Sequence, residues 1–252
     1  MINFVGAGPG AADLITVRGM RLIEEADVII YTGSLVNPDL LKYAKRSPEI
    51  YNSATMTLEE VMHVMLTKDA EGKNIVRLHT GEPSIYGAVR EQMDILDSKN
   101  RAYESTPGVS ACFGAAASLD IEYTLPGISQ TLIITRMEGR TPVPESESIE
   151  ALAAHRSSMA IYLSAGMMEE LSGRLIAGGL SKDTPAVIVY KATWPEERSF
   201  ICTVATLGKI AEENGITRTA VVLVGEAVTH KGFDRSKLYD PSFATGFRDN
   251  TR

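Results

Sequence analysis

The sequence is poor in cysteine, in long apolar runs and in positive charge, and each shortage excludes a class of protein. Its two cysteines, Cys112 and Cys202, lie far apart, which argues against a disulfide framework and against a thiolate zinc site. No stretch approaches the roughly 18 uncharged apolar residues of a membrane span. The formal net charge of −7 argues against a nucleic-acid-binding protein that works through an overall basic field.

The remaining composition is that of a folded chain. Hydrophobic residues make up 44% and charged residues 23% of the 252 positions, which excludes an intrinsically disordered protein. The first residues, MINFVG, contain neither a basic stretch nor a cleavage motif, so we expect no signal peptide and a cytoplasmic location. The length is compatible with one large domain or two of ordinary size.

The first half alternates apolar, β-branched runs with amphipathic segments. Residues 3–5, 28–31 and 75–79 are typical of buried strands, and residues 57–71 carry apolar side chains at helical spacing. Thr57, followed three residues later by Glu60, predicts a capping box at the start of that helix. Because strands alternate with helices, we expect a parallel sheet with helices on its faces.

The second half is richer in predicted strands. We expect strands at residues 131–136, 159–164, 185–191 and 220–225, and helices at residues 148–155, 166–177 and 206–214. A Pro-Gly pair at 107–108 precedes a stretch of small residues, and Leu-Pro-Gly follows at 125–127; we place a domain boundary between these signals, at residues 118–124. The sequence therefore predicts two domains, residues 1–118 and residues 119–252.

A glycine-rich turn follows the first predicted strand and has more than one interpretation. Residues 6–11, GAGPGA, fit the spacing of a dinucleotide-binding fingerprint, which would indicate a nicotinamide or flavin enzyme. Pro9, however, lacks a backbone N–H where a phosphate-binding loop needs donors, and Asp27 precedes the second strand instead of ending it. The turn could also be purely structural, or it could bind a different ligand at the carboxyl end of the first strand.

Several motifs, in a fixed order, resemble the tetrapyrrole methyltransferases. They are GAGPG at 6–10, DLIT at 13–16, RG at 18–19, ADV at 26–28, YTGSLV at 31–36, HTGEPSIYG at 79–87, TPGVS at 106–110, LPGISQ at 125–130, TR at 135–136 and ATWP at 192–195. The resemblance extends over roughly residues 2–240. One departure is Glu82, which stands where the family usually has aspartate.

This resemblance implies a fold, an activity and partners. The implied fold is α/β, with a mostly parallel N-terminal sheet, a mixed C-terminal sheet and an active-site cleft between the two domains. The implied activity is methyl transfer from S-adenosylmethionine, which leaves S-adenosylhomocysteine, to a tetrapyrrole in cobalamin synthesis. The runs at 31–36 and 126–130 favour position 11 of precorrin-4 or its cobalt form. The family habit implies a homodimer, with no nucleic acid, membrane or metal ion as a partner.

The matching motifs also imply site residues. The cofactor-binding residues would be Pro9, Gly81, Glu82, Ile85, Ser110, Ala111, Tyr162, Leu163, Ala192, Thr219 and Ala220. Leu163 replaces a methionine that related enzymes usually have, which preserves apolar packing.

A tetrapyrrole substrate carries many carboxylates, so an acidic enzyme needs local positive charge to bind it. Arginine suits carboxylates because its planar guanidinium donates two parallel hydrogen bonds. Arg136, at a predicted strand end, is the first candidate, followed by Arg198 and Lys191; Ser34 is a further candidate donor. The sequence identifies no catalytic base; His79 could assist proton loss or be a structural residue.

Three alternatives stay open at this point. The chain could methylate another precorrin, uroporphyrinogen III or a protein target, as in diphthine synthesis. It could be a nicotinamide-dependent dehydrogenase, or a tetrapyrrole carrier without catalytic activity. Binding of S-adenosylhomocysteine, as opposed to NAD, separates the first of these from the second, and methyl turnover separates it from the third.

Overall fold

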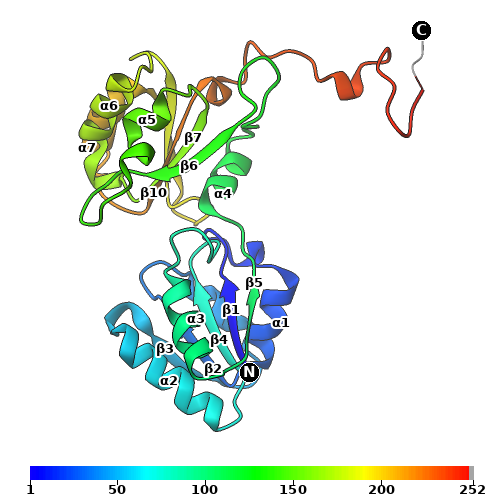
Figure 1. Ribbon diagram of the computed structural model, residues 1–252, viewed down its shortest axis with the longest axis vertical. Helices are drawn as coiled ribbons and strands as arrows, with labels where there is room; N and C mark the ends of the chain where they lie inside the picture. Colours follow the sequence, from blue (N-terminus) through cyan, green and yellow to red (C-terminus); the bar gives the residue numbers. More distant parts are fainter. Residues whose placement is uncertain (250–252) are drawn as a thin grey trace. The chain divides into compact units, whose positions relative to one another are not determined.

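The computed structural model describes residues 1–249, which form two compact units (Figure 1). The first unit contains Met1–Gly114 and, from much later in the chain, Lys191–Glu197. The second contains Ala115–Tyr190 and the chain from Arg198 onward. The place of the segment 191–197 in the first unit was not predicted from the sequence, and the domain boundary after residue 118 stays a prediction.

The first unit is built on a sheet of five parallel strands. These are β1 (Ile2–Gly6), β2 (Val28–Tyr31), β3 (Glu49–Asn52), β4 (Ile75–His79) and β5 (Tyr103–Thr106), in the spatial order β3-β2-β4-β1-β5. Every residue of β1 and β4 is buried, as expected for central strands of a sheet that is covered on both faces. The parallel arrangement predicted from the sequence is confirmed.

Helices cover the two faces of this sheet. Figure 1 shows α1 (Val17–Glu25) on one face and α2 (Leu58–Ala70) with α3 (Val89–Ser98) on the other. The burial pattern agrees, because Ile23 of α1 packs with Val5 and Ile29, whereas Met65 of α2 packs with Phe4. The predicted capping box at the start of α2 is present, with both of its reciprocal hydrogen bonds. Helix α4 (Ala111–Ser118) follows β5.

The second unit contains a mixed sheet, in the spatial order β6-β7-β10-β8-β9. Its strands are β6 (Leu132–Arg136), β7 (Ser158–Tyr162), β8 (Pro185–Tyr190), β9 (Arg198–Thr203) and β10 (Ala220–Val224). Strands β6 and β7 are parallel, while the other neighbouring pairs are antiparallel. The fold predicted from the sequence, one parallel and one mixed α/β sheet, is confirmed.

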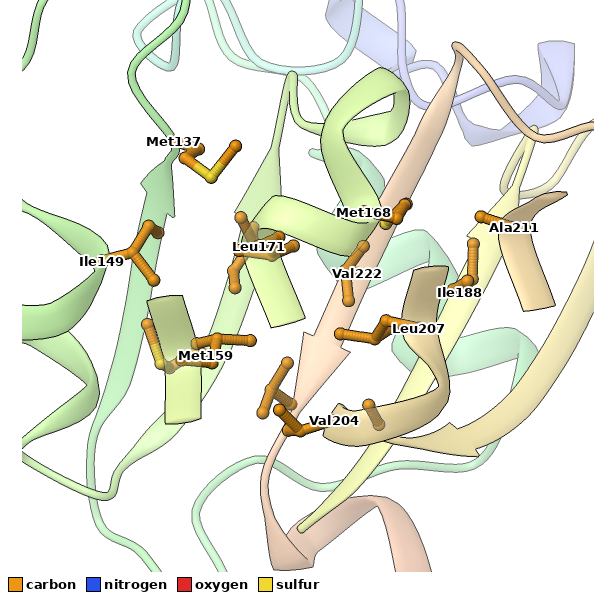
Figure 2. Packing of buried hydrophobic residues seen from close by; sticks show 14 of the residues in the cluster. Met137, Ile149, Met159, Met168, Leu171, Ile188, Val204, Leu207, Ala211 and Val222 are labelled. Carbon is orange, nitrogen blue, oxygen red and sulfur yellow. The ribbon is translucent and has the colours of Figure 1, made fainter. Parts of the chain in front are cut away.

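Three helices pack on one face of the mixed sheet. They are α5 (Ile149–Ala153), α6 (Met168–Ala177) and α7 (Leu207–Glu213). Figure 2 shows their apolar side chains, including Leu171 and Leu207, lying over Ile188 and Val222 of the sheet. Leu171, Leu207 and Ile188 are fully buried, so burial of apolar surface fixes the helices on the sheet. None of the helices within residues 1–249 is long and apolar enough to cross a membrane.

Candidate functional site

Three glycines bring the carboxyl ends of three neighbouring strands of the first unit into direct backbone contact. Gly6 ends β1, Gly81 follows β4, and Gly108 follows β5. A Cβ on Gly108 would lie 2.1 Å from the carbonyl oxygen of Gly81, and a Cβ on Gly6 would lie 2.5 Å from the Cα of Gly108. No other residue type fits at Gly6 or Gly108 without moving the backbone, so these glycines set how closely the three loops approach.

The loops after β1 and β4 are also joined by hydrogen bonds. The Gly81 amide donates to the Gly8 carbonyl oxygen at 2.9 Å, and the Ala7 amide donates to the His79 carbonyl oxygen at 2.8 Å. Gly81 adopts a φ of +59°, which favours glycine. The missing side chain of Gly81 faces Ser110 and Ala111 at ordinary contact distance, 3.7–3.8 Å from their backbone atoms. Three predicted cofactor-binding residues therefore lie together at this edge of the sheet.

Glu82 connects two of these loops through its carboxylate. One oxygen accepts a hydrogen bond from the Ser84 amide at 2.9 Å and the other accepts one from the Gly108 amide at 2.8 Å. Partial burial works to raise the pKa of Glu82, but these amide hydrogen bonds outweigh it and hold the pKa below its ordinary value. Glu82 is therefore ionised at neutral pH and fixes the loop that leads to Ser110.

The segment 191–197 closes the same edge from the distant end of the chain. Trp194 Nε1 donates a hydrogen bond to the Pro9 carbonyl oxygen at 3.1 Å, and the Ala11 amide donates to Thr193 Oγ1 at 3.0 Å. A Cβ on Gly10 would lie 2.2 Å from the Trp194 ring and 2.8 Å from the Ala192 carbonyl oxygen. The glycine turn, with the predicted residues Pro9 and Ala192, is thus packed against this segment.

The remaining candidates of the first unit lie nearby or on the surface. Ile85 is half-buried in the loop after β4, where its amide donates to the Glu82 carbonyl oxygen. The Lys191 ammonium lies 5.4 Å from the centre of the Trp194 ring and 3.6 Å from a Glu196 carboxylate oxygen. Ser34 is exposed in the turn after β2.

In the second unit, the sheet register brings several candidates to the same end of neighbouring strands. Arg136 pairs with Tyr162 across β6 and β7, and Tyr190 pairs with Ala220 across β8 and β10 and with Arg198 across β8 and β9. Two further candidates have backbones in the left-handed region: Leu163, which follows β7 and is 66% exposed, and Thr219, which precedes β10. An exposed leucine in that conformation is unusual.

The two candidate arginines have partners within this unit. Arg136 donates hydrogen bonds to the carbonyl oxygens of Met137, Thr141 and Pro142, at 2.8–3.3 Å, and so holds the loop that follows β6. The Arg198 guanidinium lies 5.0 Å from the centre of the Tyr190 ring, a cation–π distance. Arg136 therefore has a structural role, and the substrate role assigned to both residues stays a prediction.

His79, at the end of β4, is a buried, neutral imidazole. It is 5% exposed, and burial, with a smaller contribution from the charge of Arg77, lowers its pKa to about 3. Its Nε2 has no hydrogen-bond partner among residues 1–249. Within the same residues no cluster of three or more His, Cys, Asp or Glu side chains has an arrangement that could hold a metal ion.

Two elements of this edge were not found from the sequence. The glycines at positions 6 and 108 belong to the quoted motifs, but the motifs do not reveal that the two backbones touch. Thr193 and Trp194 belong to the ATWP run, which was the only signal that the segment 191–197 takes part.

Comparison with known proteins decides the family. The tetrapyrrole (corrin/porphyrin) methylases match residues 1–208 of this chain. The chain belongs to this family. This membership overturns the alternative of a nicotinamide-dependent dehydrogenase. The glycine-rich edge of the first unit is therefore part of a methyltransferase.

Individual tetrapyrrole methylases are similar over nearly the whole chain. A cobalt-precorrin-4 C(11)-methyltransferase of Methanocaldococcus jannaschii is 50% identical over 247 residues, covering 98% of this chain and 95% of that protein. The X-ray structure of a cobalt precorrin-4 methyltransferase, a cobalamin biosynthetic enzyme, superposes with a TM-score of 0.88 at 45% identity, covering 90% of this chain and 95% of that one.

A third likeness concerns the fold alone. A uroporphyrin-III C-methyltransferase of Thermus thermophilus, whose structure contains S-adenosylhomocysteine, superposes with a TM-score of 0.75 at 24% identity, covering 91% of this chain and 99% of that one. At this identity the comparison establishes that the two chains share their architecture.

Proposed function

We propose that this chain transfers a methyl group from S-adenosylmethionine to position 11 of precorrin-4 or cobalt-precorrin-4 in cobalamin synthesis. The observation that carries the proposal is its similarity to a methyltransferase of that position, at 50% identity over 98% of the chain. The motif runs YTGSLV at 31–36 and PGISQ at 126–130 support the same ring position.

The first unit fits a cofactor at the carboxyl edge of its sheet. Gly81 leaves an unfilled side-chain position beside Ser110 and Ala111, and the buried Pro9 belongs to the turn at the same edge. In an open parallel sheet, ligands bind at this edge. Pro9, Gly81, Ile85, Ser110, Ala111 and Ala192 are the residues of this unit that would contact the cofactor, with Glu82 holding the loop of Ser110. Tyr162, Leu163, Thr219 and Ala220 are the contacts proposed in the second unit.

When bound, S-adenosylmethionine supplies a sulfonium methyl that is already activated for displacement. The chain then needs no covalent nucleophile, and its contribution is to orient the reactants and exclude water. Alignment of two reactants contributes up to about 7–11 kcal/mol to catalysis. The backbone hydrogen bonds from Gly81 to Gly8 and from Ala7 to His79 serve that purpose, because they hold the loops after β1 and β4 together.

The proposed substrate contacts are cationic or hydroxyl groups. Arg136, Lys191, Arg198 and Ser34 are assigned to the ring carboxylates, with Arg136 first. The carbonyl hydrogen bonds of Arg136 do not exclude this role, since a guanidinium has five N–H donors.

The test is methyl transfer with labelled cofactor. The purified chain is incubated with carbon-13 methyl S-adenosylmethionine and, separately, precorrin-4, cobalt-precorrin-4 and uroporphyrinogen III. We expect the label at carbon 11 of one or both precorrin-4 forms by carbon-13 NMR. Labelling of uroporphyrinogen III alone would replace the proposal with the other family activity, and no labelling of any ring would favour a carrier.

The homodimer, which the resemblance implies, and the cytoplasmic location, which the sequence composition favours, stay predictions. Light scattering on the purified chain tests the first, with a mass of twice 27.3 kDa as the expected result. Cell fractionation tests the second.

A further inference from the structure

Arg77, in the middle of β4, carries a buried positive charge that no carboxylate in residues 1–249 neutralises. It is 7% exposed. Its Nε donates to Gln92 Oε1 at 3.3 Å, and its Nη1 donates to the carbonyl oxygens of Ile30 and Leu78 at 3.4 Å. These partners are neutral and the hydrogen bonds to them are long, and Nη2 makes no hydrogen bond within the described residues. An uncompensated buried charge is strongly destabilising, so a negative partner is expected.

A small pocket adjoins this guanidinium. Its volume is about 130 Å³, and Arg77 and Gln92 line it together with Ser53 and the residues at the beginning of α2, 56–58 and 61. The pocket therefore combines one buried cation with one side-chain amide, that of Gln92, whereas the Ser53 hydroxyl already donates to the Tyr31 carbonyl oxygen and the Thr57 hydroxyl already accepts from the Glu60 amide. A guanidinium beside an amide N–H group is an arrangement that recognises a carboxylate or a phosphate.

The beginning of α2 adds positive potential to the pocket. This helix has 13 residues and starts after Thr57, so the positive end of its dipole lies at the pocket wall. Two acidic residues of its first turn oppose an anion. Glu60 accepts a hydrogen bond from the Thr57 amide in the capping box, and Glu59 is the other acidic residue of this turn. Both are exposed to water, which screens them more than it screens the buried Arg77.

From this arrangement we propose that the pocket at Arg77, Gln92 and Thr57 is a binding site for one small oxyanion group. The ligand is a phosphate, a sulfate or the carboxylate of an organic acid, held by the guanidinium in the way that arginine holds planar or tetrahedral oxyanions. Binding supplies the negative charge that Arg77 lacks in the protein and stabilises the first unit. The proposal is independent of the methyl-transfer activity, because Arg77 and Gln92 are not among the residues assigned to cofactor or substrate.

The experiment uses the full chain with sodium phosphate, sodium sulfate or sodium acetate, each compared with sodium chloride at equal ionic strength. The readouts are the nitrogen-15 NMR signal of the Arg77 Nε–H and the thermal midpoint. We expect phosphate or acetate to shift that signal in a saturable manner and to raise the midpoint by a few degrees near saturation. A response to phosphate and sulfate alone identifies a free inorganic anion, and an equal response to acetate identifies carboxylates as ligands. No shift of the Arg77 signal with any of the three overturns the proposal.

Two matched variants test where the anion binds without removing Arg77. Leu58 lines the pocket at the first position of α2 and is partly exposed, so Leu58→Glu places a carboxylate of the protein in the pocket, whereas Leu58→Gln has the same size without the charge. Both variants lose the packing of Leu58 against the core, so we expect Leu58→Glu to have a higher midpoint in chloride than Leu58→Gln and to lose the anion response, and Leu58→Gln to keep the response. An undiminished anion response in Leu58→Glu would place the anion elsewhere and refute the site.

Discussion

Replacing Glu82 gives the most informative test of how the edge of the first unit is held. Its two carboxylate oxygens accept hydrogen bonds from the Ser84 and Gly108 amides, so the side chain joins the loops after β4 and β5. Glu82→Ala removes both bonds. Glu82→Gln keeps one oxygen, which can still accept from the Gly108 amide, and replaces the oxygen that accepts from the Ser84 amide with an NH2 group. The two variants therefore separate the loop contact from the charge.

The expected magnitudes follow from the two hydrogen bonds. A hydrogen bond to a charged group contributes about 1.5–3 kcal/mol, with the lower value appropriate to a partly exposed carboxylate. Glu82→Ala, which also leaves the part-buried Gly108 amide without its partner, is expected to cost about 2–3 kcal/mol. Glu82→Gln is expected to cost about 1 kcal/mol, since one acceptor is retained.

Two assays check this reasoning, urea denaturation for stability and calorimetric titration with S-adenosylhomocysteine for the cofactor site. Because Gly108 leads directly to Ser110 and Ala111, we expect Glu82→Ala to weaken binding about tenfold, equivalent to about 1.4 kcal/mol. Glu82→Gln should change the affinity less than threefold. Unchanged stability of Glu82→Ala would refute the role of this carboxylate in joining the loops. A loss of affinity at unchanged stability would mean that the carboxylate contacts the cofactor directly.

Three further predictions concern the same unit. Because the pKa of His79 is lowered from 6.5 to about 3, the unfolded chain binds one more proton than the folded chain between these pH values. His79 therefore lowers the free energy of unfolding by about 1.4 kcal/mol for each pH unit of acidification through that window. In His79→Gln, the free energy of unfolding measured by urea denaturation should fall correspondingly less steeply with pH. Trp194→Phe removes the hydrogen bond to the Pro9 carbonyl and should cost about 1 kcal/mol while weakening S-adenosylhomocysteine binding; equal affinity in calorimetry would exclude a role for that contact. Pro9→Leu should weaken the same binding without unfolding the chain, and unchanged affinity would remove Pro9 from the cofactor site.

The elements predicted correctly from the sequence are those whose surroundings are uniform. Strand β2 is a continuous apolar run and β4 is apolar at three of its five positions, because both strands are central and covered on both faces, and α2 carries its capping box. Strands β3, β5 and β9 were not predicted. Each lies at an edge of its sheet and is partly exposed. For that reason none has a continuous apolar run in its sequence, which is EIYN, YEST and RSFICT, respectively.

The candidate site shows a corresponding limit. Local motifs identified the glycine turn, the loop of Gly81 and the loop of Ser110, because close backbone approach needs glycine at fixed positions in each loop. The contact between Trp194 and Pro9 joins residues 185 positions apart, and no local pattern encodes such a separation. For the same reason the sequence could not show that the carboxylate of Glu82 binds the Gly108 amide, or that Arg136 binds carbonyl groups of its own loop.

The measurement that tests the central claim most directly is a calorimetric titration of the purified chain with S-adenosylhomocysteine, with NADH as the control ligand. The glycine-rich edge of a tetrapyrrole methylase predicts binding of S-adenosylhomocysteine in the micromolar range and no binding of NADH. Binding of NADH without binding of S-adenosylhomocysteine would contradict the assignment of this edge to a methyl donor, and the cofactor residues proposed for both units would have to be withdrawn.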